Sequence, residues 1–199
     1  MYSRWQFGAN QSGCATGKGS GAVVLHLHMA TDSDYDLNPP KLVKQQSWAT
    51  CWAAAFESVL DAAAISNRKT ESELVATYAN KVGGGINPGV LGDIAKDFGF
   101  IFNIFLDDSE TPTFSDRFII ERLKGSGAFL AASKVANLGN GAPGYHAQVV
   151  WGVLYMLPQD IGTSLALVHT MNPGRGAYEY YPLQYFQKNT PLFTCWRNA

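Results

Sequence analysis

The stretch QQSWATCWAAAFESVL, residues 45–60, carries the strongest structural signal in this sequence. Its second half is rich in alanine, and Trp52 and Phe56 are four residues apart, which is the spacing of one helical face. The stretch predicts a buried helix over residues 50–65, with Cys51 in its first turn. A cysteine at that position lies where unpaired backbone N–H groups and the helix dipole favour the thiolate, the reactive form of the side chain.

The remaining sequence predicts helices first and strands afterwards. Further helices are expected over residues 70–81, 87–98 and 113–127, because polar capping residues precede them and glycines close them. A buried strand is expected over residues 100–106, and later strands at AFLAASK (128–134), HAQVVWGVLYM (146–156), SLALVHTM (164–171) and GAYEYYPL (176–183). This order predicts an α+β fold, in which an N-terminal helical part that contains Cys51 precedes an antiparallel β-sheet.

Length and composition indicate one main domain with an N-terminal arm. The chain has 199 residues, of which 46% are hydrophobic, enough for one good core. Residues 1–40 are rich in glycine and polar residues, with one predicted strand at AVVLHLHMA (22–30). Asn38-Pro39-Pro40 interrupts regular structure, so residues 41–199 are predicted to form the folded domain.

Charge, targeting signals and cysteine content narrow the function classes. The 15 basic and 16 acidic residues are balanced, which argues against nucleic acid or an anionic membrane as the main partner. The N-terminus lacks the features of a classical signal peptide, and no apolar run is long enough to span a membrane, so a soluble protein is expected. Three cysteines do not make a disulfide framework, and a bridge between Cys14 and Cys195 is left open.

Two glutamines precede the predicted Cys51 helix. Gln45 lies six residues before Cys51, on the loop that enters the helix. From there its side-chain amide is placed to donate to an oxyanion that forms when a thiolate attacks a carbonyl, with the backbone N–H of Cys51 as second donor. Gln46 adjoins it and stays an alternative, although Gln45 is preferred.

A glutamine six positions before a Cys-Trp pair at the start of an Ala-rich helix resembles the nucleophile segment of papain-like cysteine peptidases. That family also has a histidine at the start of a later strand, and an Asn or Asp after the next one. Here His146 opens the apolar run after Gly144-Tyr145, and Asn172 follows SLALVHTM. The resemblance implies that Cys51 is the nucleophile, His146 the general acid and base, Asn172 the residue that orients His146, and Gln45 the oxyanion donor.

Plainer interpretations exist for the same residues. Cys51 alone would be read as a small buried residue, His146 as a polar strand residue and Asn172 as part of an Asn-Pro-Gly turn. His169 is a rival base, because it lies just before Asn172 on the same strand. The chemistry implied by the resemblance requires no cofactor.

Two further histidines raise the question of a metal. His26 and His28 alternate on one predicted strand and therefore share a face, a weak sign of metal binding. No additional cysteine, histidine or carboxylate stands nearby at ligand spacing. No metal site is expected.

The resemblance implies hydrolysis of peptide or isopeptide bonds, with a protein or peptide as substrate. The short chain and its Cys-Trp-Ala-Ala-Ala segment are more similar to compact bacterial papain-like peptidases, including effector and toxin proteases, than to lysosomal cathepsins. Such a protein would leave the cell by a specialised secretion system and would meet an immunity protein or a host target. Two alternatives are an amidase or endopeptidase toxin that cuts cell-wall peptides, and a catalytically silent module that binds peptides.

Overall fold

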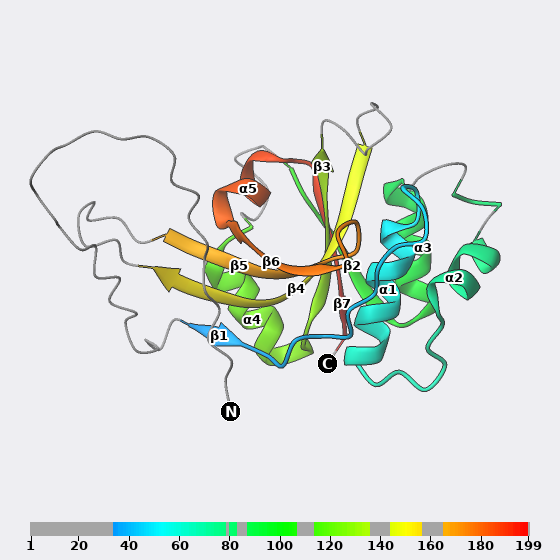
Figure 1. Cartoon of the computed structure of the whole chain (residues 1–199), viewed down its shortest axis with the longest axis horizontal. Coiled ribbons are helices and arrows are strands. Elements are labelled where there is room, and N and C mark those ends of the chain that lie inside the picture. Colours follow the sequence, from blue (N-terminus) through cyan, green and yellow to red (C-terminus); the bar gives the residue numbers. More distant parts are fainter. Residues whose placement is uncertain are drawn as a thin grey trace, which may run out of the picture.

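The computed structural model describes residues 34–78, 80–82, 87–106, 114–135, 144–156 and 165–198 (Figure 1). A seven-stranded antiparallel sheet forms its centre. Its helices are α1 (Cys51–Ala62), α2 (Glu71–Tyr78), α3 (Pro88–Asp97), α4 (Asp116–Ser126) and α5 (Leu183–Lys188). Its strands are β1 (Tyr35–Asp36), β2 (Phe100–Phe105), β3 (Phe129–Val135), β4 (Gly144–Met156), β5 (Leu165–Asn172), β6 (Ala177–Pro182) and β7 (Leu192–Arg197).

Strands β3 and β4 lie in the middle of the sheet, and β2 and β6 lie at the two ends of its strand order. The order is β2-β7-β3-β4-β5-β6, and β1 pairs with β4 outside this path. Strand β4 is the longest, at 13 residues, and its pairing with β5 shifts register between Val150 and Gly152. Because β4 and β5 are antiparallel neighbours, the start of β4 lies beside the end of β5.

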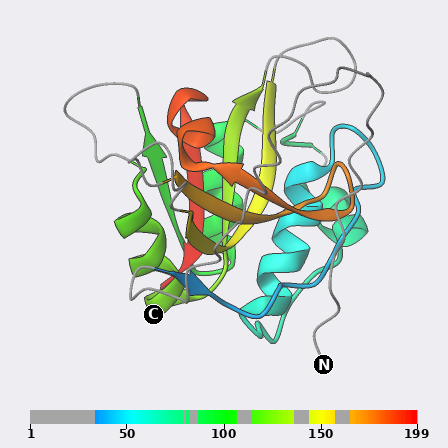
Figure 2. The ribbon, with the colours of Figure 1, turned by 60° about the vertical axis from the view of Figure 1, so that its left-hand side comes forward.

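Helices cover both faces of the sheet and bury two separate cores (Figures 1 and 2). Helices α1, α2 and α3 lie together on one side, where Trp52 and Phe56 are almost fully buried. Helices α4 and α5 contribute Ile119 and Phe186 to the core on the other face. The sheet is therefore an inner layer, and each of its faces is closed by apolar side chains.

The predicted helices are confirmed, and side-chain hydrogen bonds explain where α2 and α3 begin. Thr70 and Glu73 bond reciprocally, with Thr70 N donating to Glu73 Oε2 at 2.8 Å and Glu73 N donating to Thr70 Oγ1 at 3.3 Å. Before α3, the side chain of Asn87 accepts from the backbone N–H of Val90 at 3.0 Å. After α3, Gly99 takes a positive φ of 72°, a conformation that glycine adopts without steric cost.

The C-terminal part was not predicted. Residues 183–188 form helix α5, and residues 192–197 form β7, which pairs with both β2 and β3. The segment LFTCWR is short and buried at five of its six positions, so it shows no alternation of apolar and polar residues. Its position inside the sheet depends on partners far away in the sequence.

Some predictions fall outside the described residues. These are the strand at residues 22–30 and the glycines at residues 83–85 that were expected to close the helix predicted over residues 70–81. The division of the chain at residue 40 stays a prediction. Within the described part, Tyr35–Asp36 pairs with β4 and Leu37 packs against both cores.

Candidate active site

Cys51 is the first residue of α1, and only 3% of it is exposed. A turn over residues 47–50 leads into the helix, and Thr50 Oγ1 closes it by donating to Ser47 O at 3.0 Å. The Cys51 thiol donates to the carbonyl oxygen of Tyr145 at 3.8 Å, and the backbone N–H of Ala147 hydrogen-bonds to the sulfur. The sulfur of Cys51 thus contacts the backbone on both sides of His146.

His146 and Asn172 come together across the β4–β5 pair. His146 lies near the start of β4 and Asn172 ends β5, and antiparallel pairing makes these two positions neighbours. His146 Nε2 and Asn172 Oδ1 are 2.8 Å apart. The backbone N–H of Gly174 also donates to Asn172 Oδ1, at 3.0 Å.

Gln45 reaches the same place from the other half of the molecule. Its backbone N–H donates to Pro173 O at 3.0 Å. A Cβ added to Gly174 would lie 3.1 Å from His146 Cε1, 3.3 Å from Asn172 Oδ1 and 3.5 Å from Gln45 Oε1. The three side chains therefore surround Gly174, whose lack of a side chain leaves room for them, a role that sequence reasoning missed.

The two glutamines point in different directions. Gln46 bonds to the start of α2: its backbone N–H donates to Glu71 Oε1 at 2.8 Å and its Nε2 to Ser72 Oγ at 2.9 Å. Gln45 Nε2 donates to Ser47 O at 2.6 Å, while its Oε1 is buried and has no hydrogen-bond partner within the described residues. In this conformation Oε1, and not Nε2, is the Gln45 atom near Gly174 and His146. The side-chain amide has to flip, so that Nε2 takes the place of Oε1, before it is able to donate a hydrogen bond there.

Glu71 is a buried acidic residue that supports this loop. Only 2% of it is exposed, its carboxylate accepts from the backbone of Gln46, and its own N–H donates to Glu57 Oε2 at 2.7 Å. Its negative charge also raises the pKa of the Cys51 thiol. The sequence indicated a helix start here, but nothing in the local pattern indicated a link to residues 45 and 46.

Burial shifts the pKa values of both Cys51 and His146 in the direction that favours the uncharged form. Burial raises the pKa of the Cys51 thiol more than the backbone N–H groups of Ala147, Trp52 and Cys51 lower it. Burial also lowers the pKa of His146, although its bond to Asn172 and the charge of Glu179 act in the opposite direction. The N–H groups at the helix start therefore favour the thiolate as expected, but burial acts in the opposite direction and is the larger effect on the pKa of Cys51.

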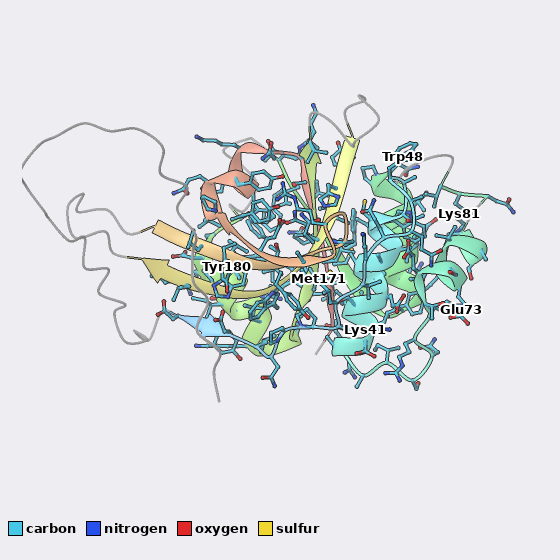
Figure 3. All side chains as sticks on the ribbon, viewed as in Figure 1. Lys41, Trp48, Glu73, Lys81, Met171 and Tyr180 are labelled. Atoms are coloured by element: carbon cyan, nitrogen blue, oxygen red, sulfur yellow. The ribbon has the colours of Figure 1, made fainter. Side chains whose placement is uncertain are left out.

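His169, the rival base, lies in a different environment. Its Nδ1 is 2.9 Å from Asp36 Oδ1, and its ring packs edge-on against Trp151 and Tyr180. Figure 3 labels Tyr180, which lies on β6 well to the left of α1. The contacts of His169 thus join β1, β4 and β6, whereas His146 contacts Asn172.

No group of three or more His, Cys, Asp or Glu side chains among the described residues is arranged to hold a metal ion. His26 and His28 lie outside the described residues. None of the described helices is long and apolar enough to cross a bilayer.

Cys195 is a free, buried thiol in β7, and burial raises its pKa, while Cys14 lies outside the described residues.

Comparisons with known proteins identify the fold. No family model and no curated protein sequence matches the chain. Among solved structures it is similar to the peptidase domain of Streptococcus ComA, a bi-functional ABC transporter involved in a quorum-sensing pathway, with a TM-score of 0.51 and 16% sequence identity. The match covers 79% of this chain and 98% of that chain. The predicted α+β papain-like fold is thereby confirmed, and at this identity the likeness shows the fold alone.

Proposed function

We propose that this chain is a cysteine peptidase that hydrolyses peptide or isopeptide bonds, with Cys51 as nucleophile, His146 as general acid and base, Asn172 as the residue that orients His146, and Gln45 as oxyanion donor. One observation carries the proposal. The sulfur of Cys51 contacts the backbone on either side of His146, and His146 Nε2 lies 2.8 Å from Asn172 Oδ1. Cys51 thus lies beside the strand segment that bears His146, and His146 lies beside Asn172, which supports the roles of nucleophile, base and orienting group.

The proposed reaction begins with an uncharged Cys51 thiol and an uncharged His146 ring. The Cys51 thiol gives its proton to His146 Nδ1 as the sulfur attacks the carbonyl carbon, and Nε2 keeps its bond to Asn172. The backbone N–H of Cys51 and the turned amide of Gln45 stabilise the oxyanion. His146 then protonates the leaving amine, which leaves a thioester on Cys51. Water attacks this thioester with His146 as base, and the acid product and the free thiol are released.

The proposal includes a substrate class and a biological setting. A protein or peptide substrate is supported by the fold, which is shared with a peptidase domain. The short chain and the Cys-Trp-Ala-Ala-Ala segment support a place among compact bacterial effector or toxin peptidases. In that setting the protein is exported, and an immunity protein or a host target is its partner.

A peptide with an electrophilic trap tests the proposed function directly. After incubation with a mixture of peptidyl vinyl sulfones, mass spectrometry should find the adduct on Cys51, because only an activated thiol beside a bound peptide reacts quickly. Cys195 is the internal control, since it is also a buried thiol with a raised pKa but has no base in the proposed mechanism. Peptide binding without an adduct on Cys51 would instead support a silent binding module.

The oxyanion role separates Gln45 from Gln46. Gln45→Ala should lower kcat by about 10²-fold with little change in KM, because one donor to the transition state is lost. Gln46→Ala is the matched control and should change kcat much less, since the Gln46 side chain bonds to Ser72 rather than toward His146. Steady-state kinetics on one peptide measures both. Equal losses would remove Gln45 from the proposed mechanism.

A further inference from the structure

The amide of Asn172 has a second set of partners on the neighbouring strand. Asn172 Nδ2 donates to Glu179 Oε2 at 2.6 Å and to the hydroxyl oxygen of Tyr181 at 3.1 Å. The Tyr181 hydroxyl donates in turn to Glu179 Oε2 at 2.5 Å. Both residues come from β6, and pairing of β6 with β5 brings them to the end of β5.

These partners determine which way the amide faces. An ionised carboxylate only accepts hydrogen bonds, so the atom of Asn172 that faces Glu179 has to be the NH₂ group. The carbonyl oxygen Oδ1 then faces His146, and the backbone N–H of Gly174 donates to the same oxygen at 3.0 Å. A swapped amide would place an oxygen against the Glu179 carboxylate and an NH₂ group against the Gly174 N–H.

The orientation of the amide selects the tautomer of His146. Because Asn172 Oδ1 is an acceptor, His146 Nε2 has to carry the proton that bridges the 2.8 Å between them. In the uncharged ring Nδ1 then has no proton. Nδ1 is therefore the nitrogen that is able to accept the proton of Cys51 in the proposed reaction.

We propose that Glu179, held by Tyr181, is a positioning residue that fixes the amide of Asn172 and thereby keeps His146 in the tautomer that accepts the thiol proton. The role in catalysis rests on the proposed function; the effect on the tautomer does not. The Glu179 side chain is 16% exposed, and its second oxygen pairs with the largely exposed Arg175 at 3.0 Å. Burial and Glu179 raise the pKa of Tyr181 to about 12, so Tyr181 keeps the proton that it donates.

Glu179→Gln tests this role because glutamine presents either an oxygen or an NH₂ group to Asn172. The amide of Asn172 is then free to turn, and kcat should fall by about tenfold to a hundredfold with KM little changed. Nitrogen-15 NMR of His146 should show a mixture of the two neutral tautomers in place of the Nε2–H form alone. The acid limb of the pH profile of kcat/KM should move to lower pH, because the negative charge that raises the pKa of His146 is gone.

A reciprocal exchange distinguishes positioning from a general structural role. Asn172→Asp alone places two carboxylates at a contact of 2.6 Å and should impair the enzyme. Combined with Glu179→Gln, the new carboxylate accepts from both His146 and the new amide and cannot be oriented wrongly. The double variant should recover at least about tenfold in kcat over Glu179→Gln and restore the Nε2–H tautomer. A merely structural loss would not be rescued by a second substitution.

The controls separate failure of this inference from failure of the proposed function. Glu121→Gln removes an exposed carboxylate on α4 and should leave tautomer and kinetics unchanged. An unaltered tautomer and pH profile in Glu179→Gln, with no rescue in the double variant, overturns the inference.

If the wild type neither cleaves peptides nor reacts at Cys51, the proposed function fails, whereas the NMR comparison still decides the role of Glu179. If Glu179→Gln does not fold, Glu179→Ala, which removes the carboxylate without adding an amide, should produce the same tautomer mixture, and an unchanged tautomer there overturns the inference.

Discussion

Cys51→Ala is expected to abolish peptide hydrolysis, with a fall in kcat of about 10⁴-fold or more, because the thioester intermediate cannot form. The fold should persist, since alanine suits the first turn of a helix and the thiol is small. Substrate binding should persist for the same reason. The measurement is release of a fluorescent amine from a peptide substrate, together with peptide affinity and the melting temperature.

Cys195→Ala is the matched control for that substitution. Cys195 is equally buried but lies in β7, between the partner strands β2 and β3. Its replacement should lower stability by about 1 kcal/mol through lost packing and leave kcat near that of the wild type. Retained activity in Cys51→Ala would refute the proposed nucleophile.

His146→Ala should have an effect of the same order, about 10⁴-fold in kcat. Burial raises the pKa of the Cys51 thiol, so without His146 almost no thiolate is present at neutral pH. The leaving amine also loses its proton donor. Activity should reappear partly at alkaline pH, where the thiol ionises without help, and a pH series of kcat/KM measures this.

His169→Ala is the control for the second described histidine. This residue is more deeply buried than His146, and it contacts Asp36, Trp151 and Tyr180. Its loss should lower the melting temperature by removing packing between β1, β4 and β6, with little change in kcat. A large loss of kcat with an unchanged melting temperature would make His169, and not His146, the base.

Local signals in the sequence predicted the elements that bear the candidate site. The apolar spacing of Trp52 and Phe56 placed a buried helix behind Cys51, and the structure begins α1 at that residue. The turn at residues 172–174 and the apolar run after His146 predicted the end of one strand and the start of another. These predictions depend on residues a few positions apart, and such short-range patterns can be read from one chain.

Contacts between distant segments could not be predicted in the same way. Glu71 bonds to Gln46 across 25 residues, and its position in the sequence suggested only a helix start. Glu179 had no predicted role, because its link to Asn172 depends on the pairing of β6 with β5. Strand β7 likewise required β2 and β3 as partners before it could be recognised.

The sequence by itself determined the order of Gln45, Cys51, His146 and Asn172 along the chain and the kind of element that bears each, because local periodicity, capping and turn chemistry act over short distances. Only the tertiary structure decided that His146 rather than His169 meets Asn172, and that Gln45 rather than Gln46 lies beside them. It also decided the direction of the Cys51 pKa shift. The physical reason is the same in each case: burial and hydrogen-bond partners depend on segments that are far apart in sequence and packed together in space.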